Sequence, residues 1–324
     1  MKAHQGCLSH TRGLGFVARA SSIKRLPIYL LFLLWARYNR HRREQTLKPT
    51  VTTIHLLSDG IIKYDGGAVF GTIPKVLWEQ RVKPDRWNRV SLGLNCLLVR
   101  TEHGNVLIDT GVGGKETSKN REMHGLTSSK LGKGLKEVGV TAKEIDVVVL
   151  THLHFAHAGG CTKIDRAGKT IPAFPMAKYY VQGACWESAI HPNERGETPH
   201  HPEDFTCLQE TGQLSLLDGD TEIVPGISVW ETGGHCQGHQ VVQINCGGEK
   251  VVFLGDMIPT PHHLALASIA AYDQYPEETL EIKRELLLQA AREGWLVVFG
   301  HGYEEKAGYL EQRNGGMTLR PVNL

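Results

Sequence analysis

Three histidines, His152, His154 and His157, lie within six residues of one another. They directly follow residues 145–150, a largely β-branched run that predicts a strand buried on both faces. In an extended segment residues two apart point the same way, so His152 and His154 can bind one metal ion together, while His157 can face the same cavity from a following helix. Imidazole suits zinc, iron, nickel or cobalt sites, whereas magnesium and calcium prefer oxygen ligands. The alternative is a loop that is rich in histidine by chance.

His235, Asp256 and His301 follow the same pattern farther along the chain. Each comes shortly after an apolar segment that predicts a strand, and each has a glycine beside it. Glycine allows a sharp turn and a close approach of the backbone. Any one of these side chains alone is more often an ordinary buried polar group. Their recurrence at strand ends predicts that they join the three histidines in one metal site.

Two runs of expected strands, each followed by helices, predict an α/β fold in which two sheets pack face to face with helices outside. We expect strands at residues 52–63, 94–100, 106–109, 145–150, 178–182, 227–232, 240–245, 250–254 and 296–299. We expect helices at residues 128–138 and 276–292.

The composition excludes several classes of protein. Of the 324 residues, 41% are hydrophobic and 22% charged, which excludes a wholly disordered chain. The net charge is +2, but residues 1–50 contain ten Lys or Arg and one acid, so residues 51–324 carry a net charge of −7. A mildly acidic body argues against binding to nucleic acid. Seven cysteines without a C-x-x-C pair favour a reducing compartment such as the cytoplasm.

The first fifty residues differ from the rest, and we place the start of the domain that carries the candidate ligands, residues 51–324, directly after them. Residues 26–36 form an apolar run of 11 residues with basic residues on both sides. This run is too short to span a bilayer. Three interpretations remain: membrane contact through residues 24–43, a cleaved export signal, or a disordered basic extension that the fold does not use, which we prefer.

The order and spacing of the candidate ligands resemble the metallo-β-lactamase superfamily. Within it, the chain looks most similar to quorum-quenching N-acyl-homoserine lactonases and related metallohydrolases. This closer likeness is carried by residues 65–71, 74–75, 95–98, 108–111, 255–260 and 271–295. The resemblance covers residues 51–310 and implies a four-layer αβ/βα sandwich with a two-metal site at one edge. It also leaves a homodimer open, since relatives are often dimers.

The resemblance implies one or two zinc ions, with iron, cobalt, manganese or nickel as alternatives, held by two sets of ligands that share Asp256. The first set adds His152, His154 and His235, and the second adds His157 and His301 together with an aspartate two places after His154. That aspartate is replaced by Ala156 in this chain. A methyl group neither ligates a metal nor accepts a hydrogen bond, so we expect a weaker second metal and lower turnover. Gly302 and Cys236-Gln237 are milder departures from the family pattern.

The implied mechanism is hydrolysis. A metal lowers the pKa of bound water from about 15.7 to about 7, which provides hydroxide to attack a carbonyl or phosphoryl centre. Asp256 and His157 are the expected catalytic residues. We prefer a small-molecule lactone or ester as substrate. The alternatives are a degenerate member that binds metal or ligand with little turnover, which Ala156 favours, and a phosphotriester or thioester hydrolase.

Phe70 and His263 are the candidates for the substrate pocket. Phe70, with Trp78 and Trp87, could form an apolar wall for an acyl or aryl group. His263 matches a histidine of relatives. Core packing for the aromatic residues and a surface loop for His263 are the alternatives.

A further histidine cluster, His191, His200 and His201, falls in a polar loop at residues 191–204. Its simplest interpretation is a solvated loop over the site, with substrate contact as the alternative. Cys236, beside His235, is a weak candidate for a nucleophile and is more simply a small buried residue.

Overall fold

The computed structural model describes residues 52–194, 199–313 and 315–324. The expected basic extension, residues 1–50, and its expected membrane contact through residues 24–43 lie outside the described residues. Within the described ranges, none of the helices has both the length and the apolar character that crossing a bilayer requires. The cysteines in these ranges are all free thiols.

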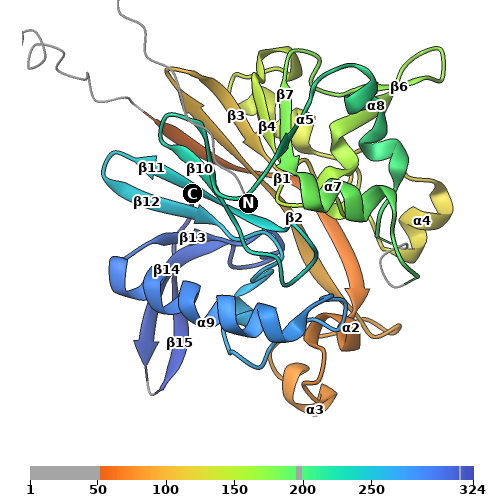
Figure 1. The fold of residues 1–324 in the computed structure, drawn as a ribbon. Helices are drawn as coiled ribbons and strands as arrows, with labels where there is room; N and C mark the ends of the chain where they lie inside the picture. Colours follow the sequence, from red (N-terminus) through yellow and green to blue (C-terminus); the bar gives the residue numbers. More distant parts are fainter. Residues whose placement is uncertain (1–51, 195–198, 314) are drawn as a thin grey trace, which may run out of the picture. The chain divides into compact units, whose positions relative to one another are not determined.

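The first sheet has six strands in the order β1-β2-β3-β4-β7-β8 (Figure 1). Its strands are β1 (Thr53–Asp65), β2 (Arg89–Thr101), β3 (Gly104–Ile108), β4 (Val147–Val149), β7 (Lys178–Gln182) and β8 (Leu214–Leu217). The pairs from β1 to β3 are antiparallel, and the pairs from β3 to β8 are parallel.

The second sheet has seven strands in the order β15-β14-β13-β12-β11-β10-β9. Its strands are β9 (Thr221–Val224), β10 (Ile227–Glu231), β11 (Gln240–Cys246), β12 (Glu249–Phe253), β13 (Leu296–Val298), β14 (Ala307–Arg313) and β15 (Gly316–Pro321). β12 and β13 are parallel, and the other neighbouring pairs are antiparallel. A separate hairpin consists of β5 (Thr162–Ile164) and β6 (Thr170–Pro172).

Helices cover both sheets or form their connections. The α-helices are α2 (Gly66–Phe70), α3 (Lys75–Trp78), α4 (Ser118–Met123), α5 (Leu131–Glu137), α6 (Phe155–Ala158), α7 (Gly183–Ile190), α8 (Thr206–Glu210) and α9 (Pro276–Glu293). Short 3₁₀ turns are η1 (Ala142–Glu144), η2 (Gly159–Cys161), η3 (Pro202–Asp204) and η4 (Pro261–His263). Figure 1 shows the long helix α9 running across the second sheet, with α5, α7 and α8 beside the first.

Successive residues of a strand face opposite sides of the sheet, and this alternation produces three apolar layers. Leu97 and Val99 of β2 pack between the sheets, in one cluster with Phe253 of β12. Leu98, between them in the chain, faces the cluster that contains residues of α5 and α7. Val252 of β12 likewise faces α9. The order is therefore helices, sheet, sheet and helix, which confirms the four-layer sandwich expected from the sequence.

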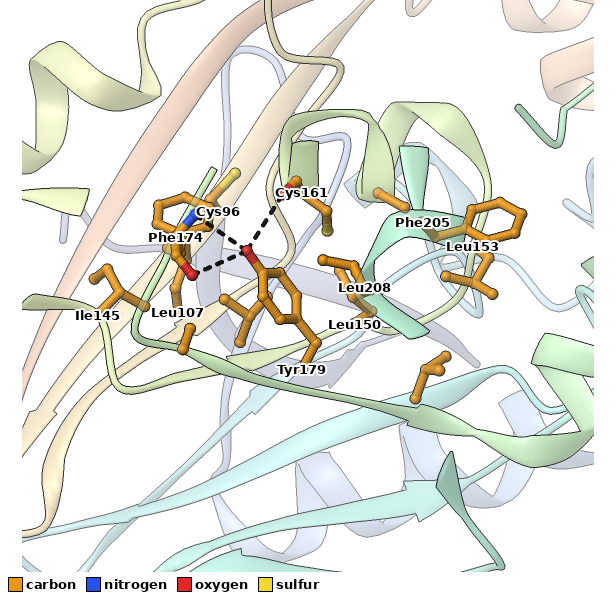
Figure 2. Close-up of a cluster of buried hydrophobic side chains, with 14 of the residues drawn as sticks. Cys96, Leu107, Ile145, Leu150, Leu153, Cys161, Phe174, Tyr179, Phe205 and Leu208 are labelled. Atoms are coloured by element: carbon orange, nitrogen blue, oxygen red, sulfur yellow. Dashed lines mark hydrogen bonds between the residues drawn. The ribbon is translucent and has the colours of Figure 1, made fainter. Parts of the chain in front are cut away.

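Tyr179 of β7 anchors the turn that follows the histidine-rich segment (Figure 2). Its ring is fully buried in the helix-covered layer of the first sheet. Its hydroxyl donates to the Cys161 carbonyl at 3.2 Å and accepts from the Phe174 N–H at 3.1 Å. These bonds tie η2, directly after α6, to the sheet.

The expected strands are confirmed, although several bounds differ. The buried runs at residues 145–150 and 296–299 contribute only Val147–Val149 and Leu296–Val298 to the ladders, because the chain leaves the sheet there to form the site. The sequence pattern does not predict β8, β9, β14 and β15, which lie at or beside sheet edges. Many of their residues are half-buried or exposed. Their sequences therefore lack the clear alternation of apolar and polar residues by which a strand is recognised.

Candidate metal centre

Two groups of buried histidine and aspartate side chains lie where strands of both sheets end. Within each group the candidate ligand atoms all lie within 4.8 Å of one another. The first group is His152, His154, His235 and Asp256, and the second is His157, Asp256 and His301. The fold thus brings together the six side chains that the sequence predicts as ligands, and Asp256 belongs to both groups.

Parallel pairing explains why residues so far apart in the chain meet. β3 and β4 are parallel neighbours in the first sheet, and β12 and β13 are parallel neighbours in the second. The carboxyl ends of each pair therefore open at the same edge. The residues are delivered as follows: His152 and His154 after β4, His157 in α6, His235 after β10, Asp256 after β12 and His301 after β13.

In the first group, lone pairs converge on a common point. His235 Nε2 lies 3.1 Å from His154 Nδ1 and 3.4 Å from Asp256 Oδ2. Because His235 Nδ1 donates to Asp273 Oδ1 at 2.8 Å, its Nε2 carries a lone pair when the ring is neutral. His152 Nε2, at 4.0 Å from Asp256 Oδ2, is buried without a hydrogen-bond partner. A cation would satisfy all of these atoms.

In the second group, two imidazole nitrogens face each other. His157 Nε2 lies 3.2 Å from His301 Nε2 and 3.2 Å from Asp256 Oδ1. His157 Nδ1 donates to Asp109 Oδ2 at 2.7 Å, and His301 Nδ1 donates to the Gly93 carbonyl at 2.7 Å. In neutral rings both Nε2 atoms then carry lone pairs, which repel unless a proton or a metal ion lies between them.

The pKa values of Asp256 and His157 also indicate that this site favours a positive charge. Burial raises the pKa of Asp256, but His301, His157 and His235 outweigh burial and hold it well below its usual range. Burial lowers the pKa of His157, but Asp256 and Asp109 outweigh it and raise the pKa to about 10. A positive charge between these groups is therefore favourable. Imidazoles with one shared carboxylate form a donor set that fits a divalent metal such as zinc.

Asp109 orients the segment after β4, a role that its place in the motif at residues 108–111 does not predict. Its carboxylate accepts from the Thr151 N–H and hydroxyl, both at 2.8 Å, as well as from His157. Asp109 adopts a positive φ of 53°, which is unusual for a residue other than glycine. It follows β3 just as Asp256 follows β12, so its position at a strand end was the available signal.

His239 holds the main chain at Asp256, another role that the sequence does not reveal. Its Nε2 accepts from the Asp256 N–H at 3.0 Å, and its Nδ1 lies 2.7 Å from the Thr232 hydroxyl. Gly255 adopts a φ of +52°, and a Cβ there would lie 2.7 Å from His239 Nε2. A larger residue at 255 would therefore displace the contact that orients Asp256.

With this geometry established, the family can be assigned. Residues 92–301, more than half of the chain, match the family model described as the Metallo-beta-lactamase superfamily. The chain belongs to the metallo-β-lactamase superfamily. With its two His/Asp clusters, this superfamily member is a metal-dependent hydrolase.

Relatives of this superfamily member include lactonases. An N-acyl homoserine lactonase from Bacillus sp. is 27% identical over 230 residues, covering 66% of this chain and 82% of the relative. A crystal structure of a probable metal-dependent hydrolase from Staphylococcus aureus matches with a TM-score of 0.76 and 31% identity, covering 86% of this chain and 100% of that chain. A quorum-quenching N-acyl homoserine lactone lactonase gives a TM-score of 0.61 and 26% identity, covering 79% and 94%. The chain is thus a distant relative of the N-acyl homoserine lactonases.

Ala156 lies in the wall of the metal centre, where it offers no ligand. The residue is buried within an apolar cluster and borders the same cavity as His157 and Asp256. The second group consequently holds three candidate ligands, one fewer than the first. The milder departure at 302 has a steric explanation, because a Cβ on Gly302 would clash with the Glu305 carbonyl oxygen.

A cavity of about 590 Å³ opens beside Asp256, His154 and His157. Tyr272, which no sequence pattern singles out, lies in its wall. The Tyr272 hydroxyl is buried without a hydrogen-bond partner, and its ring packs edge-on against His235 with centroids 5.8 Å apart. Burial and the nearby Asp256 raise the pKa of Tyr272 well above its usual range, so the phenol keeps its proton. A buried donor of this kind calls for a ligand.

Phe70 and His263, the predicted pocket residues, stack on each other outside this cavity. Their ring centroids are 5.5 Å apart, and Trp78 stacks on Phe70 at 5.2 Å. Phe70 borders a smaller cavity of about 290 Å³ that reaches His301. Both nitrogens of His263 are engaged, with the Val69 carbonyl at 2.9 Å and the Thr260 hydroxyl at 2.8 Å. The assignment of Phe70 and His263 to the substrate site therefore stays a prediction.

The other residues that the sequence singles out for the substrate site or for catalysis lie partly elsewhere than expected. Trp87 is 56% exposed and lies outside the cavity wall. The expectation of a solvated loop is wrong for His200, which is buried with its ring 4.9 Å from that of His154. His201 borders the cavity, whereas His191 is exposed. Cys236 is buried, and burial holds the pKa of its thiol well above the usual range, which disfavours a nucleophile.

Proposed function

We propose that this metal-dependent hydrolase acts on lactones or carboxylic esters of small molecules. One observation carries the proposal: the Tyr272 hydroxyl, buried without a partner, lies in the wall of the cavity that also contains Asp256, His154 and His157. A hydroxyl that can only donate into this cavity is suited to an acyl oxygen of a substrate.

The two groups of ligands would hold one divalent ion each. His152, His154, His235 and Asp256 would bind the first, and His157, His301 and Asp256 the second. A bound divalent ion supplies an activated water molecule and polarises the electrophilic oxygen. The hydrogen bonds from His157 to Asp109 and from His235 to Asp273 keep both rings oriented and present their Nε2 lone pairs.

The rest of the cavity suits an acyl group. Its lining is largely apolar and includes Tyr64, Ala68, Met123, Phe155 and Ala271. Such a wall can bind a hydrocarbon chain while Tyr272 orients the polar end. A distantly related N-acyl homoserine lactone hydrolase, 25% identical over 79% of this chain with a TM-score of 0.61, has been solved with N-hexanoyl-L-homoserine bound. That relative supports a lactone of similar size as the first substrate to test.

Ala156 favours a second candidate function. In it, the chain is a superfamily member that binds metal or ligand but hydrolyses substrate slowly. Its methyl group leaves the second group with three ligands, so the second ion would be held less tightly. The two candidates predict the same fold and the same first ligand group. They differ in turnover and in metal content.

The deciding experiment measures metal per chain and hydrolysis on the same preparation. We expect at least one zinc per chain and ring opening of N-hexanoyl-homoserine lactone, both lost on chelation and restored by zinc. An aryl ester, a phosphotriester and a thioester of matched size would define the bond cleaved. Bound zinc without turnover of any of these would leave only the second candidate, and a preference for the phosphotriester or thioester would replace the proposed substrate class.

A further inference from the structure

A pair of side chains outside the ligand groups, Glu116 and His201, lies beside the cavity. His201 Nδ1 is 3.3 Å from Glu116 Oε1. The Glu116 side chain is only 9% exposed, and its Oε2 accepts from Asn120 Nδ2 at 2.9 Å. Among the described residues, no hydrogen bond involves His201 Nε2, so this nitrogen is available to a molecule in the cavity that His201 borders.

The His201 ring lies directly on the metal-binding segment. It stacks on Phe155 with centroids 4.8 Å apart and an interplanar angle of 18°. Phe155 stands between the ligand His154 and Ala156, the position at which the family carboxylate is missing. His201, His154, His157 and Asp256 border one cavity, so a substrate at the metal centre is within the space that His201 faces.

A buried ion pair fixes the loop that carries His201. Lys115 Nζ lies 2.8 Å from Asp204 Oδ1, and both side chains are largely buried. Lys115 also donates to the Gly159 and Thr162 carbonyls, which follow α6. The loop is therefore attached to the turn that follows the metal-binding segment.

Two carboxylates lie close to the His201 ring. Glu116 is its nearest carboxylate, and Asp204 Oδ2 lies 4.0 Å from Nδ1, with Lys115 as the counter-charge of Asp204. His124 packs against Phe155 at 5.2 Å and is the other titratable ring in this wall, but burial lowers its pKa and keeps it neutral. Burial raises the pKa of Tyr64, another cavity residue, which makes it a poor acid. Among these three, His201 alone pairs with a carboxylate.

Cleavage of an ester or lactone requires a proton at a defined atom. The oxygen of water bonds to the acyl carbon, the bond between that carbon and the alcohol oxygen breaks, and the alcohol oxygen leaves with the electron pair. An alkoxide is a poor leaving group unless it receives a proton as the bond breaks. The acid formed on the acyl side releases its own proton to solvent, so water is consumed and one proton is delivered to the alcohol.

We propose that His201, held by Glu116, delivers this proton to the leaving alcohol oxygen from Nε2. The inference rests on the proposed function and names the residue that acts as the general acid. His201 becomes neutral in the step and is reprotonated from solvent, while Glu116 stabilises its charged form.

The test compares two substrates with the same acyl chain in the zinc-loaded enzyme. An alkyl ester or lactone needs the proton, whereas a nitrophenyl ester leaves as a stable phenolate without it. We expect His201→Gln to lower kcat on the lactone about 10²-fold and kcat on the nitrophenyl ester by no more than about threefold. Glu116→Gln should show the same selectivity with a smaller loss. Zinc per chain and the melting temperature should stay unchanged.

The exposed pair Glu102 and His103, whose charged atoms are 3.5 Å apart on the β2–β3 turn, provides the matched control. Glu102→Gln and His103→Gln should change kcat on neither substrate. An equal loss on both substrates in His201→Gln, or no loss, would overturn the inference while leaving the hydrolase intact. Wild-type enzyme that turns over neither substrate would instead remove the proposed function.

A second readout needs no metal. The ¹⁵N shifts of the His201 ring in zinc-free protein report its protonation directly. In Glu116→Gln the ring should lose its proton at a lower pH than in wild type, because the carboxylate that stabilises the imidazolium is gone. The Glu102→Gln variant should leave the titration curve of His201 unchanged. Identical His201 titrations in wild type and Glu116→Gln would contradict the pairing.

Discussion

His157 Nε2 and His301 Nε2 lie 3.2 Å apart, although each ring already donates its other N–H, to Asp109 and to the Gly93 carbonyl. Two neutral imidazoles in this arrangement direct lone pairs at each other. The protein can relieve the repulsion with a proton or with a metal ion. The second ligand group is therefore oriented for a cation by hydrogen bonds that are in place without one.

Zinc should stabilise the folded protein strongly, because the ligand atoms converge only in the folded state. Mass action predicts a gain of about 4 kcal/mol when free zinc is 1,000 times its Kd. Calorimetry of chelated protein, before and after zinc is added, would show this as a higher melting temperature. Magnesium should have little effect, since it prefers oxygen ligands. An equal response to both ions would argue against the imidazole site.

Ala156→Asp should strengthen the second site. The new carboxylate would extend from a buried position beside His157 and add a fourth donor to a three-ligand group. We expect higher zinc occupancy, measured by elemental analysis, together with faster turnover. Ala156→Asn is the matched control, because it has nearly the same size without the charge. If zinc per chain and turnover are the same in all three proteins, position 156 does not limit the second metal.

Tyr272→Phe separates function from stability. The substitution removes only a hydroxyl that is buried without a partner, so the folded state should become more stable, by about 1 kcal/mol. Loss of a donor aimed at the substrate should lower kcat/KM, by about 10²-fold. Tyr275→Phe, at a side chain that is 46% exposed, should change neither quantity. A variant that is more stable and fully active would show that the Tyr272 hydroxyl does not meet the substrate.

His263 should make stability depend on pH. Burial lowers its pKa to about 4, although the hydrogen bond to Val69 opposes the shift. The unfolded chain therefore binds the proton first as the pH falls. The contribution of the neutral ring is complete above about pH 6.5 and is lost as the pH falls from about 6.5 to about 4, a change of about 3 kcal/mol.

Urea unfolding of His263→Gln between pH 4 and pH 7 tests this expectation. The variant should lose part of the steep decline that wild type shows in this window. His103→Gln, at an exposed histidine on the β2–β3 turn, should retain the full decline. A decline of the same size in His263→Gln would assign the acid sensitivity to other groups.

The sequence by itself was enough to select the six candidate ligands, because local patterns mark them. His152 and His154 stand two apart behind a buried strand, and Asp256 and His301 follow apolar runs beside glycines. Strand ends and residue spacing are properties of neighbouring residues, so they can be recognised without knowing which strands pair. The same holds for the helix at residues 276–292, whereas the loss of a carboxylate at Ala156 is recognised only through the resemblance to the superfamily.

Only the tertiary structure decided what surrounds those ligands. Tyr272 and His201 reach the cavity from loops, where no periodicity predicts the direction of a side chain. The bonds from Asp109 to His157 and from His239 to Asp256 join residues 48 and 17 positions apart, respectively. Phe70 was chosen as a pocket residue from its type and His263 from its match to relatives, and the two stack on each other because packing placed them there. Contacts across the fold depend on how whole sheets and loops meet, and local sequence does not contain that information.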